Sequence, residues 1–207
     1  MAKARFFYAL RPDPASADRL AALAAQAAAR WGGRAFGAAD IHLTLAFVGM
    51  RALDEQPALE SILRGLPSHF VVGGGPASKP LALSRLGSFG NGVLWIGPQA
   101  QQPGSGERSF AHRLADELRE RLQAARIDFD DRPLKLHATL VRGADAFGRK
   151  PAIARVAGSV AADALEPRFE PIVAGEWSLS LGMSDSGSTS QRRYRWSNPE
   201  PRRTEAV

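Results

Sequence analysis

The chain has 207 residues, of which 44% are hydrophobic and 23% are charged, values ordinary for a soluble globular protein with a sizeable core. It contains no cysteine, which excludes disulfides, thiol catalysis and cysteine-ligated metal and fits a reducing compartment. The formal net charge of +6 favours anionic partners such as RNA, although genomic composition alone can give an Ala-, Gly- and Arg-rich chain this charge.

No stretch of the sequence predicts membrane insertion or export. A run of about 18 apolar residues, the length that spans a bilayer, does not occur. The apolar run Phe6–Leu10 is too short for the hydrophobic region of a secretory signal. We therefore expect a cytoplasmic protein that makes no membrane contact.

In its first half the sequence predicts strands and helices in alternation. Gly32 and Gly33 mark the end of the first helix, because glycine favours the position after a helix. Pro57 fits the second helix only within its first turn. The expected elements are a strand over Arg5–Leu10, a helix over Ala15–Arg30, a strand over Ile41–Val48, a helix over Leu53–Leu66 and a strand over Phe70–Val72.

The second half opens with a hairpin signal and continues with a strongly amphipathic helix. Gly90-Asn91-Gly92 separates two strand-like runs, and apolar residues recur every four positions over Glu107–Arg126. The expected elements are strands over Leu81–Phe89 and Val93–Gly97, the helix over Glu107–Arg126, a strand over Leu136–Arg142, a helix over Ala152–Ala161, strands over Ile172–Leu181 and Tyr194–Ser197, and a flexible tail over 199–207.

Two copies of one short pattern dominate the sequence. His42-Leu43-Thr44 and His137-Ala138-Thr139 each begin a predicted strand, and each strand follows a predicted long helix. Residues i and i+2 of a strand point to the same face, so each histidine shares a face with its threonine. We interpret the chain as one α+β domain over 1–207, in which two pseudo-symmetric lobes each contribute one motif strand to a shared cleft.

Two imidazoles that face one site suit acid–base catalysis, because one can accept a proton while the other donates. Phosphoryl transfer fits this arrangement well, with His42 and His137 on opposite sides of phosphorus, roughly 5–8 Å apart. Thr44 and Thr139 can donate to the non-bridging oxygens. Arg142 can neutralise the phosphate if a bulge or the strand end turns it to the same face. This chemistry needs no metal or other cofactor.

Each of these residues also has a plainer interpretation. A single histidine in a strand is more often a packed or surface residue, and threonine is simply a good strand former. Arg142 can be a solvated strand end. A zinc site is disfavoured because His69 and His112 have no nearby histidine partner. Duplication of the same pair at the same offset is what favours function, because packing does not require it twice.

The two motifs and their flanks resemble the two-histidine (2H) phosphoesterases, and within them the bacterial RNA 2′,3′-cyclic phosphodiesterase branch, also called LigT-like or 2′-5′ RNA ligase-like. The resemblance rests on five stretches and extends over residues 5–196. They are Arg5–Leu10, Ile41–Gly49, the Arg132-Pro133 pair before the second motif, the motif His137-Ala138-Thr139-Leu140, and Arg142 after it.

This resemblance implies a bilobal LigT-like fold, with two antiparallel sheets that flank a central cleft and helices outside. It implies metal-independent hydrolysis of RNA 2′,3′-cyclic phosphate ends to a 2′-phosphomonoester. His42 and His137 would be the catalytic pair, with His42 as base and His137 as acid. Thr44, Thr139 and Arg142 would bind the phosphate.

The resemblance also leaves several points open. Phe7 or Phe47 could stack on the RNA base, as recognition of single strands commonly requires. Leu136 stands where this branch usually has proline, and Ala138 where it often has valine. The expected partner is an RNA 3′ end that carries a cyclic phosphate, and we expect a monomer. The alternatives are a 2H phosphodiesterase for 2′-5′ linked or small cyclic nucleotides and a non-catalytic RNA-binding module.

Overall fold

The structure is a computed structural model that describes residues 2–71, 80–89, 92–98, 109–144, 170–185 and 194–197. Strands and helices alternate through most of these ranges. In chain order they are β1 (Lys3–Pro12), α1 (Pro14–Trp31), β2 (Arg34–Ala35), η1 (Ala38–Asp40), β3 (Leu43–Ala52), η2 (Leu53–Glu55), α2 (Gln56–Ser61), β4 (His69–Val71), β5 (Ala82–Ser88), β6 (Leu94–Pro98), α3 (Phe110–Ala124), β7 (Ala138–Arg142), β8 (Ile172–Val173), β9 (Glu176–Asp185) and β10 (Tyr194–Ser197).

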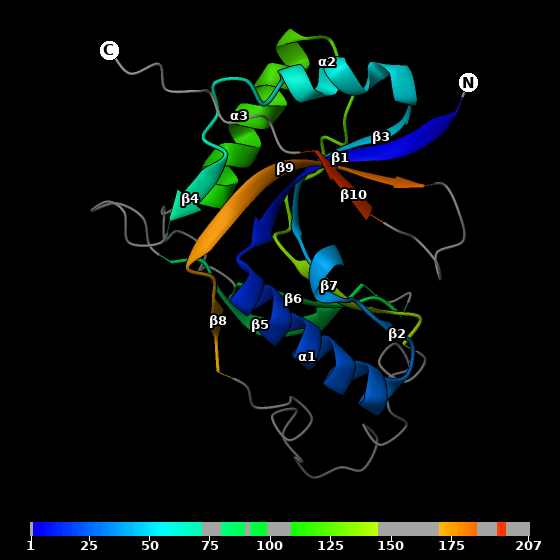
Figure 1. The fold of residues 1–207 in the computed structure, drawn as a ribbon, viewed down its shortest axis with the longest axis vertical. Coiled ribbons are helices and arrows are strands. Elements are labelled where there is room, and N and C mark those ends of the chain that lie inside the picture. Colours follow the sequence, from blue (N-terminus) through cyan, green and yellow to red (C-terminus); the bar gives the residue numbers. More distant parts are fainter. Residues whose placement is uncertain are drawn as a thin grey trace.

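The strand order is nearly symmetric about its centre. The antiparallel path runs β10-β9-β1-β3-β7-β6-β5-β8, with β2 paired to β7 and β4 paired to β9. We call the strands on the β3 side the first lobe and those on the β7 side the second lobe. The lobes are joined where Leu43 of β3 pairs with Ala138 of β7. Figure 1 shows this strand system between α3 at the top and α1 below.

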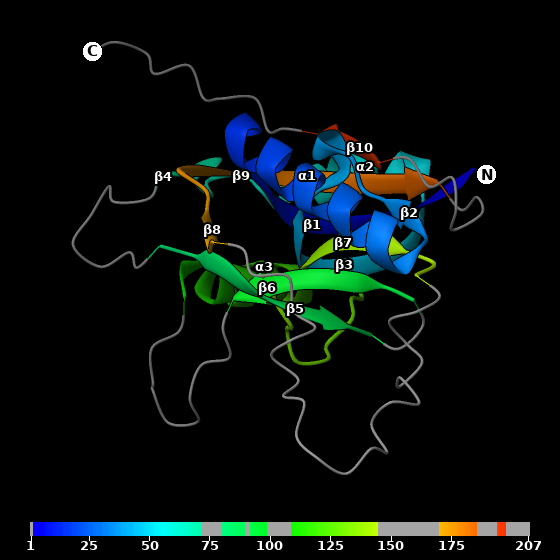
Figure 2. The ribbon, with the colours of Figure 1, turned by 90° about the horizontal axis from the view of Figure 1, so that it is seen from below.

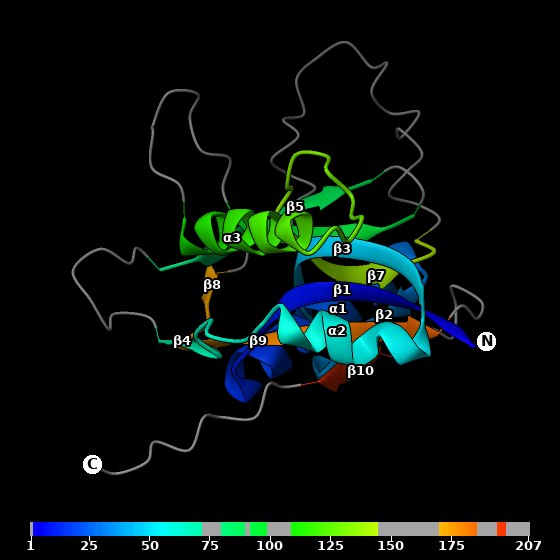
Figure 3. The same cartoon turned by 90° about the horizontal axis from the view of Figure 1, so that it is seen from above.

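Each long helix packs against the other lobe's motif strand. Helix α1 follows β1 of the first lobe but packs against β7. Helix α3 follows β6 of the second lobe but packs against β3. The two helices lie on opposite sides of the strands (Figures 2 and 3). Neither lobe is therefore complete without a helix from the other.

Local sequence explains where α1 begins and ends. The Asp13 carboxylate accepts a hydrogen bond of 2.9 Å from the Ser16 amide, which caps the helix, and Pro14 occupies the first turn, where no amide donor is needed. Gly32 follows the last turn with a φ of 74°.

Within the described ranges, no helix has the length and apolar character to cross a membrane.

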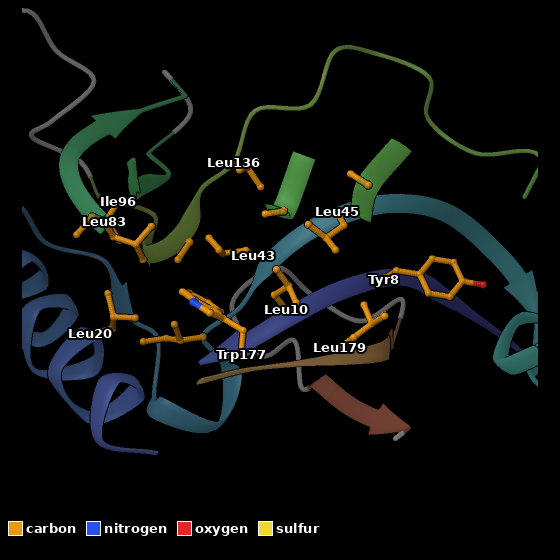
Figure 4. Close-up of a cluster of buried hydrophobic side chains, with 14 of the residues drawn as sticks. Tyr8, Leu10, Leu20, Leu43, Leu45, Leu83, Ile96, Leu136, Trp177 and Leu179 are labelled. Carbon is orange, nitrogen blue, oxygen red and sulfur yellow. The ribbon is translucent and has the colours of Figure 1, made fainter. Parts of the chain in front are cut away.

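One hydrophobic core runs through both lobes. Tyr8 and Trp177 are its largest members in the first lobe, and both are almost fully buried. Figure 4 shows Tyr8 at the edge of the cluster with its hydroxyl pointing away from the leucines; that hydroxyl donates to the Leu59 carbonyl of α2 at 2.8 Å. Buried apolar residues from both lobes and α1 complete the cluster: Leu10, Leu20, Leu43, Leu45, Leu83, Ile96, Leu136 and Leu179.

The α+β fold with antiparallel strands and outer helices is confirmed. Helix α1, the β5–β6 hairpin, helix α3 and the two motif strands all lie where the sequence predicts them. The structure refines one point, because the strands of both lobes form one continuous path rather than two separate sheets.

The predicted helix over Leu53–Leu66 is shorter than expected. Only Gln56–Ser61 is α-helical, after one 3₁₀ turn. The chain then continues in tight turns, in which the amides of Leu63 and Leu66 donate to carbonyls three residues earlier. Gly65, with a φ of 79°, stops any continuation of the helix.

The predicted strand over Ile172–Leu181 is wrong as a single element. Strand β8 pairs with β5 in the second lobe, whereas β9 pairs with β1 in the first. The chain must turn between them, and Asp13 fixes the corner by accepting from the amide of Gly175 at 2.8 Å. The predicted helix over Ala152–Ala161 and the tail over 199–207 lie outside the described residues.

Gly33 is required where α1 turns back beside β7. Its φ is 88°, and a Cβ at this position would lie 2.6 Å from the Arg142 carbonyl oxygen. We expect Gly33→Ala to lower the free energy of unfolding by roughly 2–3 kcal/mol, from backbone strain and this clash together. Gly37→Ala is the matched control, because a Cβ there meets no atom within 4 Å. Urea unfolding of both variants tests this, and equal stabilities would contradict it.

Candidate active site

The doubled motif lies where the two lobes join. His42 immediately precedes β3 and His137 immediately precedes β7. The Leu43–Ala138 pair sets a register in which each histidine lies across from the other motif's threonine. Opposed residues of a sheet share a face, so the four polar side chains lie on one face. Leu43 and Ala138 point the other way, into the core.

Both imidazoles are held by the same hydrogen bond. Nδ1 of His42 lies 2.7 Å from the carbonyl oxygen of Asp40, and Nδ1 of His137 lies 2.7 Å from that of Lys135. A carbonyl can only accept, so Nδ1 carries the proton in both rings. The neutral ring then has its lone pair on Nε2. Each histidine therefore offers Nε2 as the nitrogen that can exchange a proton with a ligand.

Burial makes both histidines weak bases. It lowers the pKa of His42 from 6.5 to about 4, although the Asp40 carbonyl acts in the opposite direction. Repulsion from His137, Arg142 and Arg11 lowers the pKa of His42 further. Burial also lowers the pKa of His137, with added repulsion from Lys135 and Arg142. The effect of His137 on His42, and of Arg142 on both, places the imidazoles in one electrostatic environment, in which lowered pKa values favour the neutral rings at pH 7.

Aromatic side chains surround His42. Phe7 stacks on the imidazole with ring centroids 5.0 Å apart, and Tyr194 and Trp196 contact its ring from β10 at 5.0 and 5.1 Å. His42 is only 9% exposed as a result. This packing explains the desolvation that lowers its pKa, and it holds the ring in one orientation.

His137 has a smaller aromatic environment from the β5–β6 hairpin. The Phe89 ring contacts it edge-on at 4.6 Å, and Trp95 lies 6.3 Å away. Phe89 and Trp95 stack on each other at 5.4 Å, and the Lys135 ammonium lies over both rings. His137 is more exposed than His42.

A glycine lies beneath one aromatic ring in each lobe. Phe7 pairs with Gly182 of β9, where a Cβ would lie 2.4 Å from the Phe7 ring. Trp95 pairs with Gly87 of β5, where a Cβ would lie 2.2 Å from the Trp95 ring. The missing side chains let both rings lie flat across the neighbouring strand. The lobes thus use the same device to position the aromatic residue beside each histidine.

A β-bulge follows the first motif. The pairing of β3 with β1 skips Leu45, since consecutive β1 residues pair with Thr44 and Ala46. A skipped residue shifts the alternation of faces by one. Phe47, which pairs with Phe7, therefore shares the face of Thr44, and it is 39% exposed.

A second bulge follows the second motif at the same offset. The pairing of β7 with β6 skips Leu140, since consecutive β6 residues pair with Thr139 and Val141. Arg142 is thereby turned to the face of Thr139, although strict alternation would turn it away. Its positive charge lowers the pKa of both histidines, as expected of a guanidinium at the same site.

The predicted site residues are thus brought to one face, with different degrees of exposure. The two histidines, Thr44, Thr139 and Arg142 gather there, with both threonines partly buried. Phe47 is available to a ligand. Phe7 is only 4% exposed and packs on His42, which leaves little of its ring for an RNA base.

Apart from Phe7, the aromatic residues around the histidines are not predicted from the sequence as part of the site. The sequence predicts Trp95 and Phe89 only as hairpin residues. The pair Tyr194-x-Trp196 carries a usable signal, because two aromatics at i and i+2 share a strand face. Contact of this pair with His42 depends on β9 lying between β10 and β1, which the sequence does not reveal.

The remaining histidines lie elsewhere and have their own partners. His69 contacts the Glu176 carboxylate, and His112 Nδ1 lies 2.8 Å from the Ser109 hydroxyl. In the part of the chain that the structure describes, no three His, Cys, Asp or Glu side chains form a group that could hold a metal ion.

The lowered pKa of His42 predicts acid sensitivity. Below pH 6.5 the unfolded chain binds a proton that the folded chain excludes until about pH 4, so stability falls as the pH falls through this window. We expect a loss of roughly 2–3 kcal/mol, which His42→Gln removes. Urea unfolding at pH 7 and 4.5 measures it, and NMR titration should give a His42 midpoint near 4. A midpoint at 6.5 would contradict the prediction.

Comparison with known proteins agrees with the fold. No protein-family model matches the chain, and no curated protein matches it. Among solved structures, LigT of Escherichia coli in complex with 3′-AMP has a TM-score of 0.60 at 20% identity and covers 94% of this chain and 95% of its own.

Two further solved structures give similar values. A phosphoesterase has a TM-score of 0.59 at 23% identity over 94% of this chain and 95% of its own. A protein of Thermus thermophilus has a TM-score of 0.55 at 22% identity and covers 93% of this chain and 94% of its own. The chain therefore has the fold of LigT and related phosphoesterases.

Proposed function

We propose that the protein hydrolyses RNA 2′,3′-cyclic phosphate ends to 2′-phosphomonoesters by acid–base catalysis with two histidines. The observation that carries the proposal is the pair of imidazoles, each with Nδ1 bound to a carbonyl and each neutral at pH 7, on one face with Arg142. LigT structures that contain 3′-AMP or phosphate support a nucleotide or phosphate ligand for this fold.

In the proposed reaction, water attacks phosphorus in line with the bond to O3′. Nε2 of neutral His42 accepts the proton of this water as the new P–O bond forms. The P–O3′ bond breaks, and Nε2 of protonated His137 donates its proton to O3′. The phosphate remains on O2′, and proton exchange with solvent restores both rings.

Burial supports this division of roles. His42 has a pKa near 4 and is the more buried ring, so at pH 7 it is in the neutral state that a general base requires. His137 must be protonated when the reaction starts. A bound phosphate raises the pKa of nearby imidazoles, and the more exposed His137 can take up its proton from solvent.

The remaining residues of the face would stabilise charge. The hydroxyls of Thr44 and Thr139 would donate to the non-bridging oxygens, and the Arg142 guanidinium would neutralise the charge that develops in the transition state. Burial strengthens these interactions because little water competes for the donors.

The first test measures hydrolysis of RNA that ends in a 2′,3′-cyclic phosphate, with EDTA present. We expect turnover by the wild type and a decrease of about 10²–10⁴-fold in kcat for His42→Ala and for His137→Ala. His69→Ala is the matched control, because that histidine lies outside the site, and it should keep full activity.

The outcomes separate the proposal from its alternatives. If the protein turns over 2′-5′ oligoadenylate or mononucleotide cyclic phosphates but not RNA ends, it is a phosphodiesterase for another substrate. Salt-dependent RNA binding without turnover of any of these would identify a binding module. Equal rates for wild type and the double alanine variant would reject the two-histidine mechanism.

Phe47 is the residue that we propose to stack on the terminal base. A stacked base contributes roughly 1–3 kcal/mol, so Phe47→Ala should raise KM for a nucleoside 2′,3′-cyclic phosphate about tenfold with little change in kcat. Ribose 2′,3′-cyclic phosphate, which has no base, is the control substrate and should show equal KM values. An equal rise for both substrates would indicate a structural defect instead.

A further inference from the structure

Two arginines lie directly opposite each other beside the candidate active site. Arg34 of β2 pairs with Arg142 of β7, so both side chains leave the sheet on one face. Both guanidiniums lie over the ring of Phe36, at 5.2 and 5.7 Å from its centroid. We call Arg34 and Arg142 the arginine pair. Like charges that face each other across a sheet destabilise it, so this arrangement calls for an explanation.

The backbone holds the arginine pair in place. The β2–β7 pairing is fixed by the close approach of Gly33 to the Arg142 carbonyl, and the Phe36 amide donates to the Leu140 carbonyl at 2.8 Å. Gly33 and Phe36 thus bracket β2 on both sides of Arg34. The two positive charges cannot separate through backbone movement without loss of these contacts.

Several donors of the arginine pair are buried and have no acceptor among the residues that the structure describes. Nε and Nη2 of Arg34 and Nε of Arg142 are in this state. Buried N–H groups of charged side chains are normally hydrogen-bonded, because leaving them unpaired is unfavourable. The Arg34 charge acts on the Asp40 carboxyl, but burial of that carboxyl raises its pKa, and its hydrogen bond comes from the Tyr194 amide. Among the described residues, the two cations therefore have too little negative charge beside them.

Arg142 connects the arginine pair to the two imidazoles. Arg142 lowers the pKa of both histidines, whereas the charge of Arg34 acts on Asp40. Tyr194 connects the two regions, since its ring contacts both Phe36 at 6.0 Å and His42 at 5.0 Å. Arg34 therefore faces Arg142 and acts on Asp40, and Tyr194 links Phe36 under the arginine pair to His42.

We infer that Arg34 and Arg142 together form a subsite for a phosphate group, with donors from both guanidiniums on its oxygens. A phosphate would supply the missing negative charge and the missing acceptors at once. Under the proposed function, this phosphate is either the reacting group, held from two sides, or the next phosphate of the RNA chain. Its binding can be measured without any turnover.

The test is the equilibrium binding of inorganic phosphate at fixed ionic strength, measured by isothermal titration calorimetry. We expect Arg34→Gln to raise Kd about tenfold or more, and Arg142→Gln to do the same, since each removes charge-assisted hydrogen bonds. Arg34→Lys keeps the positive charge but loses the planar guanidinium, so its Kd should lie between those of the wild type and Arg34→Gln. Arg30→Gln is the matched control, because Arg30 also lies over an aromatic ring, 5.1 Å from Trp31, and carries the same charge.

Circular dichroism checks that each variant is folded. Absence of phosphate binding by the wild type, or a folded Arg34→Gln variant that keeps the wild-type Kd within about twofold, overturns the subsite. If the wild type binds phosphate through Arg34 but does not hydrolyse cyclic phosphates, the subsite is supported and the proposed function is rejected.

Kinetics with two substrates then identifies the phosphate. If it is the reacting group, Arg34→Gln raises KM for a nucleoside 2′,3′-cyclic phosphate. If it is the next phosphate of the chain, KM rises only for the same nucleotide with a 5′-phosphate. Either result supports the subsite, and unchanged KM for both substrates overturns it.

Discussion

The site depends on the single cross-strand pair between Leu43 and Ala138. This pair joins two lobes whose remaining strands are arranged in nearly the same order on either side. It buries two apolar side chains on one face and places two imidazoles on the other. A shift of the register by one residue would turn each histidine toward the core and each leucine or alanine toward solvent, because the side-chain period of a strand is two. Core packing therefore fixes the site geometry.

Around that pair the two lobes repeat three devices and differ in the residue five positions after each histidine. Each imidazole is held by a carbonyl two residues before it, each has an aromatic neighbour that lies over a glycine, and each motif strand has a bulge three residues after its histidine. The bulges bring Phe47 and Arg142 to equivalent positions. One lobe thus offers an apolar ring where the other offers a cation, which suits a ligand with a base at one end and a phosphate at the other.

Much of this could be predicted from the sequence, since it depends on local pattern. The motif strands follow from alternation, α1 from its caps, and the hairpin from its glycines. The rest depends on contacts between distant segments. The bulges at Leu45 and Leu140 exist only relative to β1 and β6, and the turn at Gly175 arises because β8 and β9 pair in different lobes. The role that we propose for Arg34 depends on the pairing of β2 with β7, which places it opposite Arg142. The residues next to Arg34 in the sequence do not indicate this pairing.

The pairing of β1 with β9 has a consequence for synthesis of the chain. Strand β1, which contains Phe6 and Tyr8, precedes the other described strands in the chain, whereas its partner β9 follows all of them except β10. Until then β1 has one unpaired edge, which exposes backbone donors and acceptors to other chains. The nascent protein therefore depends on the late strand β9 to cover the edge that the early strand β1 leaves open, and a chain truncated before Glu176 would keep an aggregation-prone edge.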